Sequence, residues 1–274
     1  MRRNLVSMRY YETYYYANIV HNVLSEPGEY LRSLNDWHVN SQSRLFSAPF
    51  EKWSVLHDFC RFVIRALLDE RISRKEADSF ARRPNAELQI DQALRFHGFA
   101  VDGFRDWLHE QQVDLAGLTE DHIADYHVEL SVSGPLEDLL EQLSQEVFFI
   151  IFANRLLLAN LHDYISGVLS RVSCEDVDEE IAPRFTKAGR LRRCRVPKWA
   201  KSAVYFRDRG RCARCLADLT GLVASQNDQN FDHIVPLALG GMNDVTNLQL
   251  LCGACNRRKS ATPQVPLTRY EAWY

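Results

Sequence analysis

The stretch "FDHIVPLALGGMNDVTNLQLLCGACNRRKS", residues 231–260, brings four chemically distinct features into one short span. They are an Asp-His pair, a Gly-Gly turn, an isolated Asn and a Cys-x-x-Cys pair. A second pair, "CARC", lies upstream at Cys212 and Cys215. The segment therefore looks like a metal-stapled fold, and the question is whether it only binds or also catalyses.

The two Cys-x-x-Cys pairs predict one structural zinc site. Each pair places two thiolates on a tight turn, and two such turns close a tetrahedral site without an open position. We therefore expect Cys212, Cys215, Cys252 and Cys255 to bind Zn²⁺. The gap between the pairs is longer than the roughly 15–20 residues of a zinc ribbon, so a strand and a loop must be inserted. The alternative is four buried or redox cysteines. The odd total of 7 cysteines argues against a disulfide framework.

Asp232 and His233 form a candidate pair of metal ligand and general base. A histidine has a pKa near neutrality and needs little tuning to accept a proton. Neighbours on a flat strand face opposite sides, so both serve one site only if the strand ends or bulges there. Pro236 and the Gly-Gly loop favour such an ending.

Two asparagines complete the candidate site. Asn256 directly follows Cys255, where its amide oxygen can ligate Mg²⁺ or cap the following helix. Asn247 lies in a loop, where asparagine more often bonds nearby backbone than substrate. We interpret it as the brace of the loop that carries the site.

The combination "CARC … FDHIVPLALGG … NLQLLCGACNRRKS" resembles the HNH endonuclease family, in the subgroup stapled by four cysteines. The similarity covers about residues 196–261, including the lead-in "VPKWAKSAVYFRDRGRC". It implies a ββα-metal domain that cuts phosphodiester bonds with one divalent cation. By this resemblance, His233 activates water, Asp232 and Asn256 hold the catalytic ion, and Asn247 orients the loop or the base. Asn256 stands where the family's name has His, which shifts the expected metal toward Mg²⁺ or Mn²⁺.

Basic residues surround these motifs and predict a nucleic-acid-binding surface. Residues 183–274 carry 16 Lys and Arg against 6 Asp and Glu, a net charge of +10, whereas residues 1–182 carry −13. Such charges give salt-dependent contacts with a phosphate backbone. A solvated basic face is the alternative. The candidate contacts are Lys198, Lys201, Arg207, Arg209, Arg211, Arg214, Arg257, Arg258 and Lys259.

The first 182 residues predict a mainly α-helical domain. Apolar residues recur at helical spacing around residues 53–67, and further helices are expected over 85–99, 101–112 and 118–130. Thr119 is an expected N-cap, and residues 135–172 should form one long helix or two. The fold class is thus a helical domain, 1–182, followed by a small α+β domain, 183–274, with a helix over 198–207 and a strand over 230–237.

The expected function is metal-dependent hydrolysis of DNA, with RNA not excluded, in a bacterial restriction or anti-phage defence setting. The acidic helical domain should bind a partner protein, self-associate or restrain the nuclease. The absence of an apolar run of roughly 18 residues and of a signal-peptide pattern makes a cytoplasmic protein the expectation, with no membrane contact. Two alternatives stay open: a zinc-stapled nucleic-acid-binding module, and a protein-interaction scaffold with an inactive HNH domain.

Overall fold

The computed structural model describes residues 7–30, 34–37, 48–170, 179–222, 228–262 and 266–270. Contacts between residues group the chain into two compact units. Unit 1 comprises Met1–Ile19 and Phe59–Phe148, and unit 2 comprises Val20–Asp58 and Phe149–Tyr274. This grouping does not follow the expected division into a helical domain, 1–182, and an HNH domain, 183–274, which stays a prediction.

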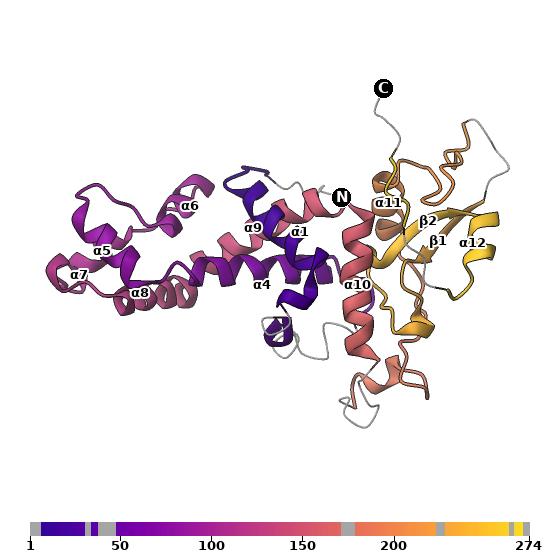
Figure 1. The fold of residues 1–274 in the computed structure, drawn as a ribbon, viewed down its shortest axis with the longest axis horizontal. Helices are drawn as coiled ribbons and strands as arrows, with labels where there is room; N and C mark the ends of the chain where they lie inside the picture. The colour runs from indigo at the N-terminus through magenta and orange to yellow at the C-terminus, as the bar shows by residue number, and fades with distance from the viewer. Residues whose placement is uncertain are drawn as a thin grey trace. The chain divides into compact units, whose positions relative to one another are not determined.

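The architecture is mostly helical, with a small antiparallel sheet and a helix near the C-terminus, as the sequence predicts (Figure 1). The α-helices are α1 Thr13–Ser25, α4 Val55–Asp69, α5 Arg74–Arg82, α6 Gln89–His97, α7 Phe104–Glu110, α8 Glu120–Ser133, α9 Pro135–Ile151, α10 Arg155–Leu169, α11 Lys198–Arg207 and α12 Gly253–Lys259. The strands are β1 Gln229–His233 and β2 Leu248–Cys252. Within the described residues, no helix is long and apolar enough to cross a membrane.

Polar side chains set the ends of the short helices in unit 1. Asp91 accepts a hydrogen bond from the backbone N–H of Phe104, at 3.1 Å, where α7 begins. Gly98 ends α6 in the left-handed conformation, with φ of 80°, which glycine adopts without steric cost. The predicted N-cap at Thr119 is present, and the ring of His122 accepts from the Thr119 N–H at 3.1 Å. His122 thus takes the place that Glu or Gln holds in a capping box.

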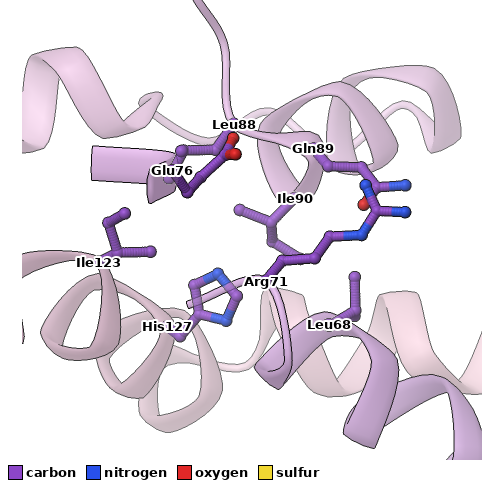
Figure 2. A pocket seen from close by; sticks show the side chains of 8 residues that line it. All are labelled: Leu68, Arg71, Glu76, Leu88, Gln89, Ile90, Ile123 and His127. Atoms are coloured by element: carbon purple, nitrogen blue, oxygen red, sulfur yellow. The ribbon is translucent and has the colours of Figure 1, made fainter. Parts of the chain in front are cut away.

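The interior of unit 1 is filled by aromatic side chains and leaves little empty space. Phe104 is fully buried and packs against Phe80, Trp107 and Tyr126, with ring centroids 5.1–5.8 Å apart. Figure 2 shows a pocket lined by residues that include Leu68, Ile90, Ile123 and His127. Its volume is about 20 Å³, which is room for about one water molecule. This pocket is therefore a packing gap and not a ligand site.

The long apolar segment from Pro135 forms two helices, which settles the alternative that the sequence left open. The helix α9 ends at Ile151, and α10 begins at Arg155. The side chain of Asn154 accepts hydrogen bonds from the N–H groups of Leu156 and Leu157, at 3.2 and 3.3 Å, and so caps α10. In unit 2, α10 packs against the short 3-10 helix η6 Val245–Asn247.

The sheet of unit 2 pairs β1 with β2 so that Asp232 lies opposite Gln249 and His233 opposite Leu248. The helix α12 contacts both strands, and α11 contacts β2 (Figure 1). The apolar side of this layer is built on buried Val204, Leu248 and Leu250. The expected helix over 198–207 is confirmed at those bounds.

The expected strand over 230–237 is shorter than the sequence suggested. It ends at His233, although the N–H of Ile234 still donates to the carbonyl of Asn247 at 2.6 Å, in register with the ladder. The reciprocal bond is missing, because the N–H of Asn247 donates to the carbonyl of Asp244 at 3.1 Å. Pro236 then precedes the 3-10 helix η5 Leu237–Leu239.

Candidate functional site

The four sulfur atoms of the two Cys-x-x-Cys pairs converge in unit 2. All of them lie within 4.8 Å of one another, and Sγ of Cys215 is 3.8 Å from Sγ of Cys252. A tetrahedral zinc ion with Zn–S bonds of about 2.3 Å requires sulfur–sulfur separations of about 3.8 Å. The donor set of four sulfurs and its spacing therefore fit a structural zinc ion, as the sequence predicts.

Backbone hydrogen bonds hold both turns in place. The N–H of Ala213 donates to the carbonyl of Leu250 at 2.8 Å, which ties the first turn to β2. Cys252 caps α12, because its sulfur accepts from the N–H of Cys255 at 3.4 Å. Burial alone would raise the pKa of the Cys252 thiol, but this backbone bond and the neighbouring thiols lower it to about 7. A thiolate, the form that binds zinc, is thus favoured at Cys252, whereas burial first, and the neighbouring thiols next, raise the pKa of Cys215 to about 12 and raise that of Cys255.

His233 lies buried at the end of β1, with 2% of its surface exposed. By strict geometry neither ring nitrogen makes a hydrogen bond within the described residues, but the side chain of Asn243 lies close enough to the ring to favour its protonated form. Burial, and next the positive charge of Arg193, lower its pKa to about 4, although the carboxylate of Asp232 opposes this shift. The imidazole is therefore neutral near pH 7, with a nitrogen lone pair that is able to accept a proton.

Asp232 faces the helix α12. Its Oδ2 atom lies 2.8 Å from Nζ of Lys259, in an ion pair that is mostly shielded from solvent. Lys259 also donates to the carbonyl of His233 at 2.7 Å. One turn earlier on α12, Nδ2 of Asn256 lies 3.4 Å from Oδ1 of Asn230. Since Asn230 and Asp232 share one face of β1, the structure brings Asp232 and Asn256 to the same strand–helix surface.

Asn247 is fully buried and closes the loop that follows β1. Its Oδ1 accepts from the N–H of Val235 at 2.9 Å, and its Nδ2 donates to the carbonyls of Val235 and Met242 at 3.0 and 2.9 Å. A side chain at Gly241 would meet the Val235 carbonyl at 2.0 Å, so the Gly-Gly turn lets the loop fold back on itself. The contacts of Asn247 are those expected of a loop brace, and its role in catalysis stays a prediction.

Asp232 and His233 line one cleft, although neighbours on a strand normally point to opposite sides. The strand ends at His233, which removes this difficulty. The cleft has a volume of about 670 Å³, within the roughly 300–1,000 Å³ of ligand sites. Its other walls come from the loop after β1, from the end of α12 and from a segment upstream of the first cysteine pair; they include Pro236, Leu237, Ser260, Thr186, Arg190, Arg192 and Arg193.

Residues 212–262 match the family model of HNH endonucleases. This matched segment begins at the first zinc cysteine and contains β1, the Asn247 loop, β2 and α12. The chain therefore carries an HNH nuclease-type domain, and the helical N-terminal part has no family match. No curated protein and no solved structure matches the chain.

Two of the predicted nucleic-acid contacts of the HNH region are corrected by the structure. Lys259 is 1% exposed and pairs with Asp232, so its charge is engaged inside the protein. The side chain of Arg207 is 1% exposed, pairs with Asp208 and donates to the carbonyl of Leu248 at 2.6 Å. Both residues hold the fold together and do not present their charge to a phosphate backbone.

The other predicted contacts occupy more varied surroundings. Arg211 pairs with Asp218 at 3.5 Å, and Arg258 donates to Sγ of Cys255 at 3.5 Å. Nζ of Lys201 lies over the ring of Phe231, 5.6 Å from its centroid. Lys198, Arg214 and Arg257 are exposed. Contact of these residues with nucleic acid stays a prediction.

The arginines of the cleft wall were missed as site residues. Arg190, Arg192 and Arg193 stand in the basic segment "RLRRCR", which is not among the predicted nucleic-acid contacts. The density of arginine there was the available signal. Nothing in the local sequence indicates that this segment folds against His233, because that contact joins residues about forty positions apart.

Proposed function

We propose that the protein is a metal-dependent endonuclease that hydrolyses phosphodiester bonds of DNA, with His233 as the general base. The observation that carries this proposal is the placement of a buried, neutral imidazole and a carboxylate in one cleft of the HNH segment. A general base must be unprotonated at the working pH and must reach the attacking water. His233 meets the first condition, and its position on the cleft wall supports the second.

The residues present fit a divalent cation such as Mg²⁺ or Mn²⁺. The carboxylate of Asp232 and the amide oxygen of Asn256 are hard oxygen donors, which these ions prefer. Oδ1 of Asp232 makes no hydrogen bond within the described residues, whereas Oδ2 pairs with Lys259. When bound, the ion would neutralise charge on the scissile phosphate and on the leaving oxygen. The protein itself supplies two further functions. His233 accepts the proton of the attacking water, and Asn247 holds the loop beside His233 in place.

A second candidate function is nucleic-acid binding without cleavage, by a zinc-stapled module or a scaffold with an inactive HNH domain. The ion pair between Asp232 and Lys259 favours it, because an ammonium group at 2.8 Å competes with a cation for the carboxylate. Against it, a binder has no use for a buried imidazole on the cleft wall whose ring nitrogens make no well-formed hydrogen bond, since burying polar atoms in this way costs free energy.

We further propose that residues 1–182 act as an acidic partner-binding, self-associating or regulatory domain, and that the setting is restriction or anti-phage defence. The support for the first is the net charge of −13, which disfavours direct contact with nucleic acid. The defence setting rests on context alone, because an unrestrained nuclease endangers its own genome.

The test is cleavage of supercoiled plasmid and of RNA, with and without Mg²⁺ or Mn²⁺, by wild type and three variants. His233→Ala should cut about 10²–10⁴-fold more slowly at every metal concentration, because proton transfer is lost. Asp232→Ala and Asn256→Ala should cleave more slowly because they bind the metal less tightly. A higher concentration of Mg²⁺ or Mn²⁺ should partly restore their cleavage activity. His109→Ala, which removes an exposed histidine of unit 1, is the matched control and should cut like wild type.

The result that contradicts the proposal is cleavage by His233→Ala at the wild-type rate with a normal zinc content. Binding of DNA without cleavage by any metal-loaded wild-type sample would favour the second candidate function.

A further inference from the structure

Residues 185–193, here called the basic hairpin, form a folded element on the wall of the cleft. Phe185 and Leu191 are buried and pair as an antiparallel bridge. The turn between them is closed by the Thr186 N–H, which donates to the carbonyl of Arg190 at 2.7 Å, and Gly189 adopts a φ of 68°. The hairpin lies outside the segment that matches the HNH family.

Contacts of the hairpin fix it against the loop that joins β1 to β2. Nδ2 of Asn243 donates to the carbonyl of Arg192 at 2.8 Å. The side chain of Arg192 turns back and donates through Nε to the carbonyls of Pro183 and Phe185, at 3.1 and 2.9 Å. Arg192 therefore serves the fold of the hairpin, and Asn243 ties this fold to the loop that Asn247 braces.

Arg190 and Arg193 have a different role from Arg192. Both line the cleft that contains Asp232 and His233, and neither forms an ion pair with a carboxylate among the described residues. The positive charge of Arg193 also lowers the pKa of His233. Among the described residues, the one acidic residue that lines the cleft, Asp232, is offset by Lys259. The described lining of the cleft thus carries positive charge that it does not itself neutralise.

An uncompensated arginine pair beside a candidate general base is suited to phosphate. The planar guanidinium group donates to two phosphate oxygens at once and stays charged at any working pH. A nucleic-acid strand that places one phosphate at His233 carries further phosphates on either side of it. Contacts to those neighbours would set where the strand lies across the cleft and carry no base specificity.

We propose that the basic hairpin is a phosphodiester-binding wall in which Arg190 and Arg193 hold the nucleic-acid backbone beside His233. This inference rests on the proposed nuclease function, and it assigns strand positioning to residues upstream of the HNH segment. The residues of this wall are different from the predicted nucleic-acid contacts around α11 and α12. The shared ligand chemistry is the phosphodiester backbone, which DNA and RNA both supply.

The experiment measures binding in the full-length chain with His233→Ala as the background, so that cleavage does not interfere. Fluorescence anisotropy follows a labelled DNA strand and an RNA strand of the same sequence over a salt series. Adding Arg190→Ala and Arg193→Ala together should weaken binding at least about tenfold at low salt. The magnitude of the slope of log K against log[salt] should fall by about 1.4–1.8, since each of the two lost phosphate contacts removes roughly 0.7–0.9.

The control is Arg195→Ala, which removes one positive charge, against two in the double variant, from an exposed residue two positions beyond the hairpin and outside the cleft lining. It should weaken binding by less than about twofold, because screened charges away from the strand contribute little. Zinc content and melting should match the background in all variants, since Arg190 and Arg193 make no ion pair that folding needs. Comparing the DNA and RNA strands identifies which backbone the wall holds.

The proposal is overturned if the double variant binds like the background, or if Arg195→Ala weakens binding as much. Either result, with a wild-type chain that cuts plasmid, would leave the nuclease proposal intact. A wild-type chain that never cuts, together with loss of binding in the double variant, would instead support the wall and reject the nuclease.

Discussion

The aromatic interior of unit 1 and the sheet of unit 2 are stabilised by different means. In unit 1, buried rings such as Phe80, Phe104 and Tyr126 pack together, and apolar burial is the dominant favourable contribution. In unit 2, two strands of 5 residues each pair with each other alone, and such a hairpin is marginally stable by itself. Four converging sulfurs lie at its end.

This difference explains why the candidate chemistry lies where it does. The cleft residues Asp232 and His233 and the loop brace Asn247 are polar and mostly buried, which a small apolar core tolerates poorly. A bound zinc ion contributes on the order of 10–16 kcal/mol and can hold such a segment together without adding apolar volume. A zinc ion at the four cysteines would supply this stability and leave the neighbouring polar residues available to the candidate site.

Zinc removal should have the largest effect. It should destabilise the sheet region of unit 2 and leave the aromatic interior of unit 1 nearly unchanged. We expect a chelator, or Cys252→Ser, to raise amide hydrogen exchange strongly in β2 and α12, because the sulfur cluster loses its ion. Exchange in α6 and α7 should change little, because aromatic packing holds them. Hydrogen-exchange mass spectrometry on the full chain makes the measurement.

Cys194→Ser is the control, because Cys194 lies outside the cluster and its sulfur makes only a long contact with the carbonyl of Arg192. It should retain zinc and the wild-type exchange pattern. Equal loss of protection in both units after zinc removal would show that they are not stabilised separately.

Gly241→Ala should have an intermediate effect confined to the loop after β1. The new methyl group would lie 2.0 Å from the Val235 carbonyl, so the loop braced by Asn247 must shift. We expect a loss of about 1–3 kcal/mol in the free energy of unfolding, as for an overpacked site. Urea denaturation measures the loss.

Gly117→Ala in unit 1 is the matched control, because nothing lies within 4 Å of the added methyl group. It should change the free energy of unfolding by no more than about 0.5 kcal/mol. A similar loss in both variants would mean that helix or turn propensity, and not the close approach in the loop, determines the cost.

Acidification should have the smallest effect that distinguishes the units, through Glu146 of unit 1. Burial would raise the pKa of this carboxyl, but hydrogen bonds from His97, the Thr13 hydroxyl and the Arg9 N–H lower it below the ordinary 4.5. The ionised form therefore stabilises the folded state above about pH 4.5, and this contribution is lost as the pH falls through the lowered pKa.

We expect Glu146→Gln to be less stable than wild type at neutral pH, with a difference that shrinks in acid. Zinc loss affects both proteins alike, so the difference between their urea midpoints isolates Glu146. Glu141→Gln, an exposed residue on the same helix, is the control. A difference that does not depend on pH would contradict the assignment.

Several features could be predicted from the sequence because they depend on residues close together in the chain. The helix over 198–207 and the N-cap at Thr119 belong to this group. The convergence of the two cysteine pairs joins distant residues, but it could be predicted because four thiols in two Cys-x-x-Cys turns suit one zinc ion. The capping partner His122 was not expected, because imidazole rarely takes the place of Glu or Gln. The break between α9 and α10 was left open, since apolar periodicity continues across it while Asn154 alone marks the new helix.

The sequence by itself determined the HNH resemblance, the zinc ligands and the identity of the candidate base. Those conclusions rest on spacing within turns and on the intrinsic chemistry of cysteine, histidine and asparagine, which need no knowledge of distant residues. The tertiary structure alone decided which charges are available. It buried Lys259 and Arg207 against Asp232 and Asp208, and it brought Arg190 and Arg193 to the cleft. The reason is physical: whether a cation is paired or free depends on which carboxylates fold against it, and contacts between distant residues set that pairing.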